Sequence, residues 1–574
     1  MTASPPRART LARWILPPQP DPALVAALAS ELMLPDAVCR LLVQRGFGVS
    51  DTAKRYLRPR LDQLNDPCTM LDLDRAVQRL ARAVREREMI MVHGDYDVDG
   101  MSATSLLVRA IRGFGGTVTP FIPRRLVDGY DLTMAGVRAA IDAGAKVLVT
   151  ADCGTNAIEP VRALCEAGID VIVSDHHLPS GPLPDCLAVL NPKRPGCDYP
   201  DKDLAAVGIA FKLALALAKE LGQNDSPIYR MLDLVALATI ADVAPLRGEN
   251  RVLARYGLKV MAETTNVGLR ALIRSAGLEG KALTAGRVGF ILAPRLNAVG
   301  RLGHALRGVE LLTSEDESQA NGIARELEEL NVRRQAIDRA TLEEARKMVE
   351  QLDLDSTYGI VLAGEGWHPG VIGIVASRLV EEFGRPVVLV AVENGEGKGS
   401  GRSITPFDLH GALSDIRDLF IRFGGHRAAA GVTIAADKIP EFARRFNEIA
   451  RAKLTADDLI PEVRVDMEIP LSQVGFDLEA LFRHFEPFGP SNASPVLVTR
   501  GVRLAVPPRI VGNGHLKLRV VSNDGGDLEL LGWGMAALGD ELDVTTPFDI
   551  AYRLERDDFN GEPRVQGRLA DLRR

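Results

Sequence analysis

The chain has 574 residues, which predicts several domains because a single domain usually holds about 100–200 residues. Its composition is 46% hydrophobic and 25% charged, without an apolar run near the ~20 residues that span a bilayer, so a membrane protein is excluded. The net charge of −7 excludes a generally basic protein, although a local patch can still bind phosphates. Without a signal-peptide pattern at its start, the chain is expected to be cytoplasmic.

The N-terminal segment is basic, with nine Lys and Arg against four Asp and Glu in residues 1–60. It could touch phosphates, although a solvated terminal segment is the commoner explanation of such a pattern. Six cysteines are scattered through the chain without a CxxC pair, so they predict reduced thiols and neither a disulfide framework nor a thiolate zinc site.

From about residue 65 to 200, short apolar runs alternate with helical periods, a pattern typical of a doubly wound parallel α/β sheet. Helical stretches with apolar residues three and four apart cover Met101–Ile111, Gly136–Ala143 and Ala157–Ala167. The predicted strands are Met89–Val92, Thr117–Ile122, Ala145–Val149, Asp170–Val173 and Leu187–Leu190.

A helical region is predicted at about 204–310, followed by one long helix. Ser314 and Glu317 form a capping-box pattern at its start, and the segment to Leu352 has no proline and only one glycine. If unbroken, this helix would be about 55 Å long at ~1.5 Å per residue. It is long enough to connect two domains.

A second, smaller α/β domain is predicted from Tyr358–Ala363, Gly370–Phe383 and Pro386–Ala391, with glycine-rich turns at 395–401 and 424–425. From about residue 463 the runs are short and bounded by turns, which favours a small β-barrel of the oligonucleotide-binding type. These runs are Pro495–Val498, Leu516–Val521, Leu528–Trp533 and Phe548–Leu554. The predicted segments are therefore 1–64, 65–312, 313–352, 353–456 and 457–574.

The strongest chemical pattern lies directly after the first predicted strand, where His93, Asp95, Asp97 and Asp99 alternate with other residues before Gly100. Carboxylates placed this closely repel one another unless cations neutralise them. A solvated turn is the alternative explanation, and we consider it the weaker one.

Three further groups stand at the ends of predicted elements. Asp152 follows the strand at 145–149, the run Asp175-His176-His177 follows the strand at 170–173, and Asp242 ends an apolar helical run. The carboxyl ends of parallel strands share one edge of a sheet, so these groups can converge there. Each has an ordinary explanation, such as a helix cap or a core histidine. Together they predict a binuclear site, and histidine with carboxylates but no thiolate suits Mn²⁺ or Mg²⁺.

With these residues in view, the chain resembles the DHH phosphoesterase superfamily, which is named for the motif seen here at Asp175, His176 and His177. The run Gly424-Gly-His-Arg-Ala-Ala-Ala-Gly431 resembles the signature of the DHH-associated domain. The order of parallel-sheet domain, long helix, associated domain and β module is similar to that of RecJ nucleases. The resemblance covers essentially the whole chain.

This resemblance implies a two-metal exonuclease that degrades single-stranded DNA from the 5′ end to 5′-mononucleotides, in recombination and repair. His93 and Asp97 would hold one cation, Asp99, His176 and Asp242 the other, and Asp152 would bridge them. Asp95 and Asp175 could instead orient the ligands. His177 would face substrate phosphate or assist protonation. A monomer is expected, with single-strand-binding protein and a helicase as candidate partners.

Strand recognition is expected from the second domain, where Gly399-Ser400-Gly401-Arg402-Ser403 can offer hydroxyls and a guanidinium to a terminal phosphate. A plain glycine-rich hairpin is the alternative. His426 is expected to line the same cleft between the two α/β domains. By resemblance, the further phosphate-contacting candidates are Arg124, Arg125 and Arg301. Aromatic residues of the β module, such as Phe482 and Trp533, could equally be core or stacking platform.

Two other functions compete. Another DHH enzyme, such as a nanoRNA or cyclic-dinucleotide phosphodiesterase or a family II pyrophosphatase, would lack the extra β domain. A non-catalytic replication scaffold would have lost its metal ligands, whereas every ligand position is filled here by a competent residue.

Overall fold

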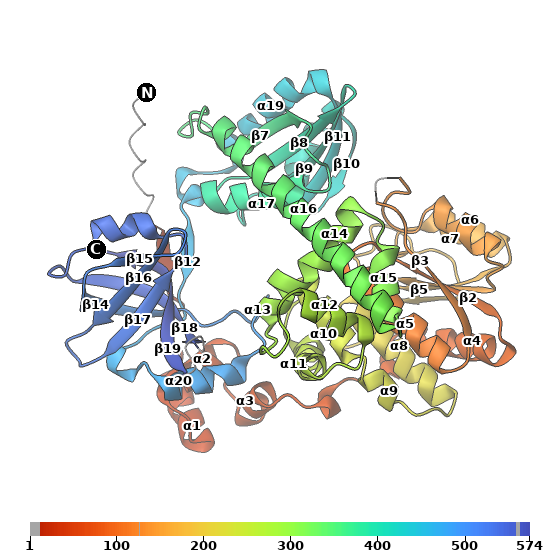
Figure 1. The fold of residues 1–574 in the computed structure, drawn as a ribbon, viewed down its shortest axis with the longest axis horizontal. Coiled ribbons are helices and arrows are strands. Elements are labelled where there is room, and N and C mark those ends of the chain that lie inside the picture. Colours follow the sequence, from red (N-terminus) through yellow and green to blue (C-terminus); the bar gives the residue numbers. More distant parts are fainter. Residues whose placement is uncertain (1–11, 126, 558–562) are drawn as a thin grey trace. The chain divides into compact units, whose positions relative to one another are not determined.

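The structure is a computed structural model that describes residues 12–125, 127–557 and 563–574. The chain divides into two compact units. Figure 1 shows its ribbon with the helices and strands labelled. The parallel-sheet unit holds residues 55–333 and 485–494. The two-sheet unit holds residues 12–54, 334–484 and 495–574.

Each unit combines segments that are distant in the chain, so the two units do not follow the five predicted segments one after another. The N-terminal segment joins the C-terminal module because strand β1 (Arg13–Ile15) pairs in parallel with β12 (Glu462–Arg464). The Trp14 indole also donates a buried hydrogen bond of 2.7 Å to Asp571. The segment boundaries themselves stay predictions, and the first eleven residues of the basic segment lie outside the described residues.

The parallel-sheet unit is built on five parallel strands in the order β3-β2-β4-β5-β6, as predicted. The chain goes from β2 outward to β3 and then crosses to the other side of β2 to form β4. In open α/β sheets ligands bind at the carboxyl ends of the strands where the order reverses, here between β2 and β4. The strands are β2 (Met89–Gly94), β3 (Thr117–Phe121), β4 (Val147–Ala151), β5 (Asp170–Ser174) and β6 (Ala188–Leu190).

Both faces of this sheet are covered, which explains why its strands are almost continuously apolar. Successive residues point to opposite faces: Ile90 and Val92 join the core under α4 (Leu73–Glu86), α5 (Val98–Gly113) and α8 (Ala206–Glu220). Met91 and Leu148 join a second core under α6 (Met134–Asp142) and α7 (Ile158–Glu166). The doubly wound prediction is confirmed.

The helical region predicted at 204–310 is also confirmed. Its helices pack on the α5 side of the sheet around one apolar core. After α8 they are α9 (Ser226–Tyr229), α10 (Leu232–Ala241), α11 (Gly248–Ala262), α12 (Val267–Ser275), α13 (Ala285–Arg287), a π-helical turn (Val288–Leu292), α14 (Ala293–Leu302) and α15 (Leu306–Thr313).

The long helix is α16 (Glu317–Val349), and the boundary between the two units falls within it, after Arg333. Its 33 residues correspond to about 50 Å. The predicted capping box at Ser314 and Glu317 is wrong. Asp316 caps the helix instead, because its Oδ1 accepts a 2.6 Å hydrogen bond from the Gln319 N–H, while the Ser314 hydroxyl contacts Gln319 Oε1.

The first sheet of the two-sheet unit has the order β10-β11-β9-β8-β7, with β7 and β8 parallel and the others antiparallel. The predicted strand–helix–strand unit is confirmed. One face carries α17, and the other packs against α18 and α19. The elements are β7 (Ile360–Glu365), α17 (Ile372–Phe383), β8 (Val387–Glu393), β9 (Glu396–Arg402), α18 (Leu409–Ser414), β10 (Phe420–Gly425), β11 (Ala429–Ala435) and α19 (Ile439–Lys453).

The glycine-rich turn predicted at 395–401 is wrong for all but Gly395, because residues 396–401 belong to strand β9. Its glycines alternate, so all three face the same side, where valine side chains of the neighbouring strands occupy the space. A Cβ on Gly399 would lie 2.4 Å from Val432 Cγ2, and one on Gly397 would lie 2.6 Å from Val390 Cγ1. The alternation places Ser400 and Arg402 together on the opposite face. The turn predicted at 424–425 is the end of β10.

The second sheet of this unit forms the C-terminal module, with the order β13-β14-β18-β19-β17-β16-β15. Strands β14 and β16 also pair over two residues, Arg503 with Val521 and Leu504 with Val520. This pairing curls the sheet so that strands distant in its order meet. The fold agrees with the predicted oligonucleotide-binding type. Its strands are β13 (Met467–Glu468), β14 (Leu497–Leu504), β15 (Arg509–Val511), β16 (His515–Val521), β17 (Asp527–Gly532), β18 (Phe548–Asp557) and β19 (Arg564–Arg573).

The remaining helices are α1 (Pro22–Leu32), α2 (Asp36–Gln44), α3 (Ser50–Leu57) and α20 (Phe476–Phe482). Short 3₁₀ turns lie at Leu61–Gln63, Pro67–Thr69, Arg417–Leu419, Ala436–Lys438, Ala456–Leu459, Leu471–Gln473, Arg483–Phe485 and Ala536–Glu541. All six cysteines are free thiols, as predicted. Over the described ranges, none of the helices is both long and apolar enough to cross a bilayer.

Candidate metal centre

The loop after β2 is fixed by the start of α5. Asp97 caps this helix, since its Oδ1 accepts hydrogen bonds from Asp99 N (2.9 Å) and Gly100 N (3.1 Å). A Cβ on Gly100 would lie 2.5 Å from the backbone N and O of Asp95, so only glycine allows this close turn. The alternating aspartates are therefore held rigidly at the carboxyl end of β2.

Asp152 directly follows β4 at the neighbouring strand end. It is 2% exposed, and its Oδ1 has no hydrogen-bond partner. Its backbone has φ of 71°, a left-handed conformation that is unusual for a residue other than glycine. Strain of this kind persists where surrounding structure enforces it, often at functional sites.

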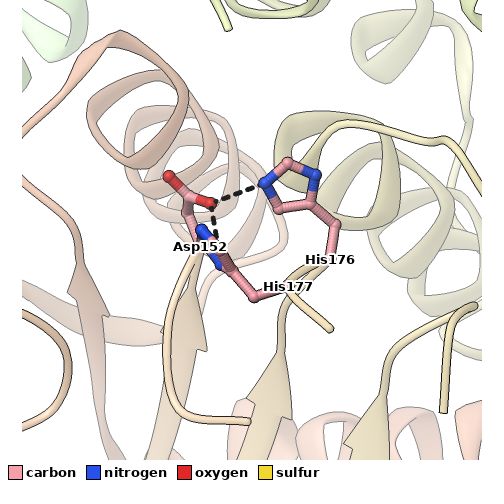
Figure 2. A group of neighbouring side chains, drawn as sticks. All are labelled: Asp152, His176 and His177. Carbon is pink, nitrogen blue, oxygen red and sulfur yellow. Dashed lines mark ion pairs between the residues drawn. The ribbon is translucent and has the colours of Figure 1, made fainter. Parts of the chain in front are cut away.

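The two histidines that follow β5 contact this carboxylate. Figure 2 shows Asp152 with dashed lines to both imidazole rings: Oδ1 lies 3.2 Å from His176 Nε2 and 3.9 Å from His177 Nδ1. The three side chains come from the ends of neighbouring parallel strands, β4 and β5. The convergence predicted from the sequence is thus present in the structure.

His176 also faces Asp99 and Asp242. Its Nε2 lies 4.0 Å from Asp99 Oδ2 and 3.8 Å from Asp242 Oδ2. The Asp99 carboxylate is buried and accepts backbone hydrogen bonds of 2.8 and 2.9 Å from Ala206 and Val207, at the first turn of α8. A helix N-terminus favours negative charge, so it orients this carboxylate.

Three overlapping groups of side chains could each hold a metal ion, with ligand atoms within 4.8 Å of one another. They are Asp95, Asp97 and Asp152; Asp152, His176 and His177; and Asp99, His176 and Asp242. Asp152 and His176 each belong to two of them. This overlap suits a pair of adjacent cations that share ligands.

The electrostatics of the site fit bound cations. Burial, followed by repulsion from neighbouring aspartates, raises the pKa values of Asp95, Asp99 and Asp152 well above their usual range. The same causes raise the pKa of Asp242 to about 7. Burial lowers the pKa of His176 to about 3, which keeps its imidazole neutral and able to bind a metal. Positive charge placed among these groups would relieve the repulsion.

Unpartnered buried atoms point the same way. Asp95 Oδ1 and Asp152 Oδ1 are buried without a hydrogen-bond partner, which is costly unless something else satisfies them. The adjacent Cys153 thiol is not a competing ligand, because burial raises its pKa well above the usual range and it stays protonated. Oxygen and imidazole donors without thiolate suit Mn²⁺ or Mg²⁺.

Asp175 lies outside these three groups and holds His177. Its Oδ1 lies 2.7 Å from His177 Nδ1, and its Oδ2 accepts a 2.9 Å hydrogen bond from Thr155 N. Although burial acts to lower the pKa of His177, the hydrogen bond to Asp175 raises it to about 9. This geometry supports the orienting role, whereas Asp95, the other residue considered for that role, lies within a potential ligand group.

Tyr130 was not singled out from the sequence. Its hydroxyl lies 3.1 Å from His177 Nε2, the nitrogen that Asp175 does not hold. The neighbouring Asp131 accepts a 2.7 Å hydrogen bond from Gly154 N, which ties this loop to the Asp152 turn. The polar run Asp128-Gly-Tyr-Asp131 just before a helix was the available sequence indication.

His93 is fully buried, but it belongs to none of the potential ligand groups found among the described residues. Its Nε2 has no hydrogen-bond partner, and its Nδ1 lies 3.5 Å from Cys153 Sγ. Burial lowers its pKa to about 4. Its role as a metal ligand therefore stays a prediction.

Two of the three predicted arginines of this unit border the cluster. Arg125 lies 4.9 Å above the Tyr96 ring, between Asp95 and Asp97 in the chain. Arg301 is in the last turn of α14, next to Gly300, where a Cβ would lie 2.2 Å from Tyr96 O. Arg124 is exposed and pairs with Asp128 at 3.1 Å.

The remaining predicted residues belong to the two-sheet unit. Ser400 and Arg402 face the first turn of α17, where a Cβ on Gly373 would lie 2.8 Å from Ser400 Oγ and 3.2 Å from Arg402 Nη2. The Ser403 hydroxyl instead donates to the Phe407 carbonyl at 2.9 Å. His426 is exposed in the hairpin between β10 and β11.

Comparison with known proteins gives a consistent picture along the chain. Residues 89–239 match the family model of the DHH family N-terminal domain, residues 356–452 match the DHHA1 domain, and residues 465–571 match the RecJ OB domain. A Bacillus subtilis protein named single-stranded-DNA-specific exonuclease RecJ is 38% identical over 562 residues, which covers 97% of this chain and 70% of that protein.

Solved structures agree with the sequence matches. The crystal structure of RecJ from Thermus thermophilus in complex with Mn²⁺ has a TM-score of 0.84 at 34% identity, covering 99% of this chain and 80% of that one. The corresponding Mg²⁺ complex has a TM-score of 0.78 at 32% identity, covering 98% and 78%.

Proposed function

Since the chain belongs to the RecJ family, we propose that it is a 5′ to 3′ exonuclease specific for single-stranded DNA, which releases 5′-mononucleotides in recombination and repair. Its cofactors are two divalent cations, Mn²⁺ or Mg²⁺. The observation that carries the proposal is the meeting of Asp152 with His176 at the ends of β4 and β5, with Asp99 and Asp242 beside them. Digestion of strands labelled separately at each end, with and without added Mn²⁺, tests both polarity and metal dependence.

The side chains of the cluster divide the chemistry between them. His93, Asp97, Asp99, Asp152, His176 and Asp242 would hold the cations. When bound, the two cations lower the pKa of a water molecule and stabilise charge on the scissile phosphate. None of the cluster residues has to form a covalent bond to the substrate.

His177 is placed for a separate task. Because Asp175 holds Nδ1, only Nε2 can face the substrate, and a substrate oxygen would replace or share its 3.1 Å contact with the Tyr130 hydroxyl. A pKa of about 9 keeps the ring protonated near neutral pH, so Nε2 can donate to a phosphate oxygen or to the leaving oxygen. The Tyr130 hydroxyl faces the same nitrogen and can orient it.

Recognition of the 5′ end is proposed for Ser400 and Arg402 in the two-sheet unit. The Arg402 guanidinium is held by hydrogen bonds from Nη1 to Ser400 Oγ (3.3 Å) and Gly401 O (2.7 Å). Both side chains face the first turn of α17, whose N–H groups favour an anion. A terminal phosphate matches this combination of hydroxyl, guanidinium and helix start.

Replacing Arg402 by Ala should lower kcat/KM about 10- to 100-fold on 5′-phosphorylated strands, because a charge-assisted contact to phosphate is lost. The loss should be much smaller on 5′-hydroxyl strands, which have no terminal phosphate to bind. Arg444→Ala is the matched control, since this exposed arginine lies on α19, which packs on the opposite face of the sheet. Equal losses on both substrates would remove Arg402 from end recognition.

Capture of single strands is proposed for the C-terminal module. Trp533 is 53% exposed, and the centroid of its ring lies 4.5 Å from that of His515. The two rings together offer an aromatic surface. Phe482 and Tyr552, by contrast, are buried and belong to the core. Bases of any sequence can stack on such a surface.

Replacing Trp533 by Ala should weaken binding of long single strands about 5- to 50-fold, while Mn²⁺ affinity stays unchanged. Phe476→Ala, at a comparably exposed aromatic on α20, is the control. Fluorescence anisotropy with long and very short strands measures the effect, and unchanged affinity for long strands would contradict the stacking role. A point variant is a cleaner test than removing the whole module from residue 463. That deletion would also remove residues 485–494, which belong to the parallel-sheet unit, where the Phe485 carbonyl accepts a hydrogen bond from Arg251.

The partner predictions remain part of this proposal. The protein is proposed to be a cytoplasmic monomer that works with single-strand-binding protein and a helicase. Light scattering of the isolated protein tests whether it is a monomer. A binding measurement with single-strand-binding protein tests that partnership.

A further inference from the structure

The helix that runs from α13 into α14 contains a built-in π-helical turn, Val288–Leu292, which exposes Phe290. This ring is 87% exposed, although Val288 and Leu292 in the same turn are buried. Pro294 explains the turn, because proline has no N–H to donate and its ring clashes with the carbonyl four residues before it. The wider turn avoids that clash, and the Ala293 N–H donates to Val288 O, five residues back.

Arg295 stabilises this irregular turn. Its Nη1 donates to the Ile291 carbonyl at 2.5 Å, while its guanidinium also pairs with Glu328 of α16. The carbonyl is therefore satisfied despite the irregular geometry. These contacts hold the turn that exposes Phe290.

A second exposed apolar side chain, Val243, directly follows Asp242. It is 64% exposed and has φ of 59°, although a β-branched residue in this left-handed region is a clear outlier. Ala244, next to it, and Leu246 are buried, whereas the strained Val243 faces outward.

The two features belong to packed elements. A Cβ on Gly289, next to Phe290, would lie 3.5 Å from Ile240 Cγ2, and the Val243 N–H donates to the Ile240 carbonyl at 3.3 Å. Ile240 is in the last turn of α10, which ends just before Asp242. Both exposed side chains therefore border the end of the helix that supplies a predicted metal ligand.

We propose that Phe290 and Val243 form an apolar step that packs against a nucleobase of the strand whose phosphodiester is bound at the Asp242 cluster. This inference rests on the proposed nuclease function and names a contact beyond it. Two side chains are far too small for a protein interface, which needs about 800 Å² per partner, but they match the face of one base. Val243 directly follows Asp242 in the chain, so a base flanking a phosphate bound there would be close to this border, and every base offers a face for stacking.

Replacing Phe290 by Ala should raise KM for single strands about 5- to 100-fold with little change in kcat, because stacking is lost while the metal cluster is intact. Phe290→Trp should keep the wild-type KM, because tryptophan also offers an aromatic face for stacking. Ile141→Ala is the matched control, an exposed apolar residue at the carboxyl-terminal end of α6, at the opposite edge of the sheet. An unchanged KM in Phe290→Ala would overturn the proposal.

Abasic strands make the test specific. A single abasic nucleotide, moved stepwise along the first positions of the strand, should raise the wild-type KM most at the position whose base stacks on Phe290. At that position Phe290→Ala should add no further loss, because the partner base is already absent. Additive losses at every position would refute the stacking contact.

Val243→Gly separates function from stability. Glycine adopts the left-handed conformation without strain, so this variant should unfold at a higher temperature, yet it should bind single strands more weakly. If Val243→Gly binds single strands as tightly as wild type, Val243 does not contribute to the base contact. Wild-type protein that fails to digest single strands would refute the proposed function itself, whereas digestion by wild type with unaltered Phe290→Ala and Val243→Gly variants would refute only the present inference.

Discussion

Replacing Asp152 by Asn should reduce kcat by on the order of 10³-fold or more while the metal-free protein becomes more resistant to heat. Asp152 belongs to two of the three potential ligand groups, so its loss should weaken both cation positions. Its carboxylate is buried and is repelled by the neighbouring aspartates, so removing its charge relieves this cost in the absence of metal. Asn is preferable to Ala because it tolerates the left-handed backbone at this position.

The measurements are single-strand digestion, calorimetric titration with Mn²⁺ and thermal unfolding in chelator. Asp233→Asn is the matched control: this aspartate is equally buried in the same unit, but it accepts a 2.5 Å hydrogen bond from the Thr264 hydroxyl and lies outside the ligand groups. The control should keep two bound Mn²⁺ ions and its activity. Wild-type turnover in Asp152→Asn would refute the assignment of the centre.

Metal-free protein should lose stability as the pH rises from about 6.5 to 9, and Mn²⁺ should reverse this trend. The pKa of His177 is raised to about 9, so the native state binds more protons than the unfolded state in this interval and its stabilisation disappears as the pH rises through 9. The pKa of Asp242, which is raised to about 7, acts in the same direction in the lower part of this interval.

The lowered pKa of His176 does not oppose this effect, because its ring is neutral in both states above about pH 6.5. With Mn²⁺ present, deprotonated ligands bind the cation more tightly, so stability should rise with pH. Thermal unfolding between pH 6 and 9, in chelator and in Mn²⁺, measures both slopes. Asp175→Asn should flatten the metal-free slope by removing the partner that raises the His177 pKa. Parallel slopes in chelator and Mn²⁺ would be incompatible with a metal site here.

The sequence by itself determined the parallel sheet and where the chemistry would lie. Short apolar runs such as Met89–Val92 and Ala145–Val149 alternate with helical periods, and parallel strands must present their carboxyl ends at one edge. Asp152 and His176 could therefore be expected to meet without knowledge of a single contact. The long helix was equally visible, because its apolar period continues without proline.

Tertiary structure decided what each side chain does at that edge. Asp175 turns toward His177 while Asp95 joins the ligand groups, and this difference depends on side-chain directions set by packing rather than on spacing in the chain. The glycines of β9 were mistaken for a turn, since only the valines of adjacent strands show why a Cβ is excluded there. The π-helical exposure of Phe290 likewise arises from Pro294 and Arg295 acting together on a helix already packed against α10, a combination that no local pattern displays.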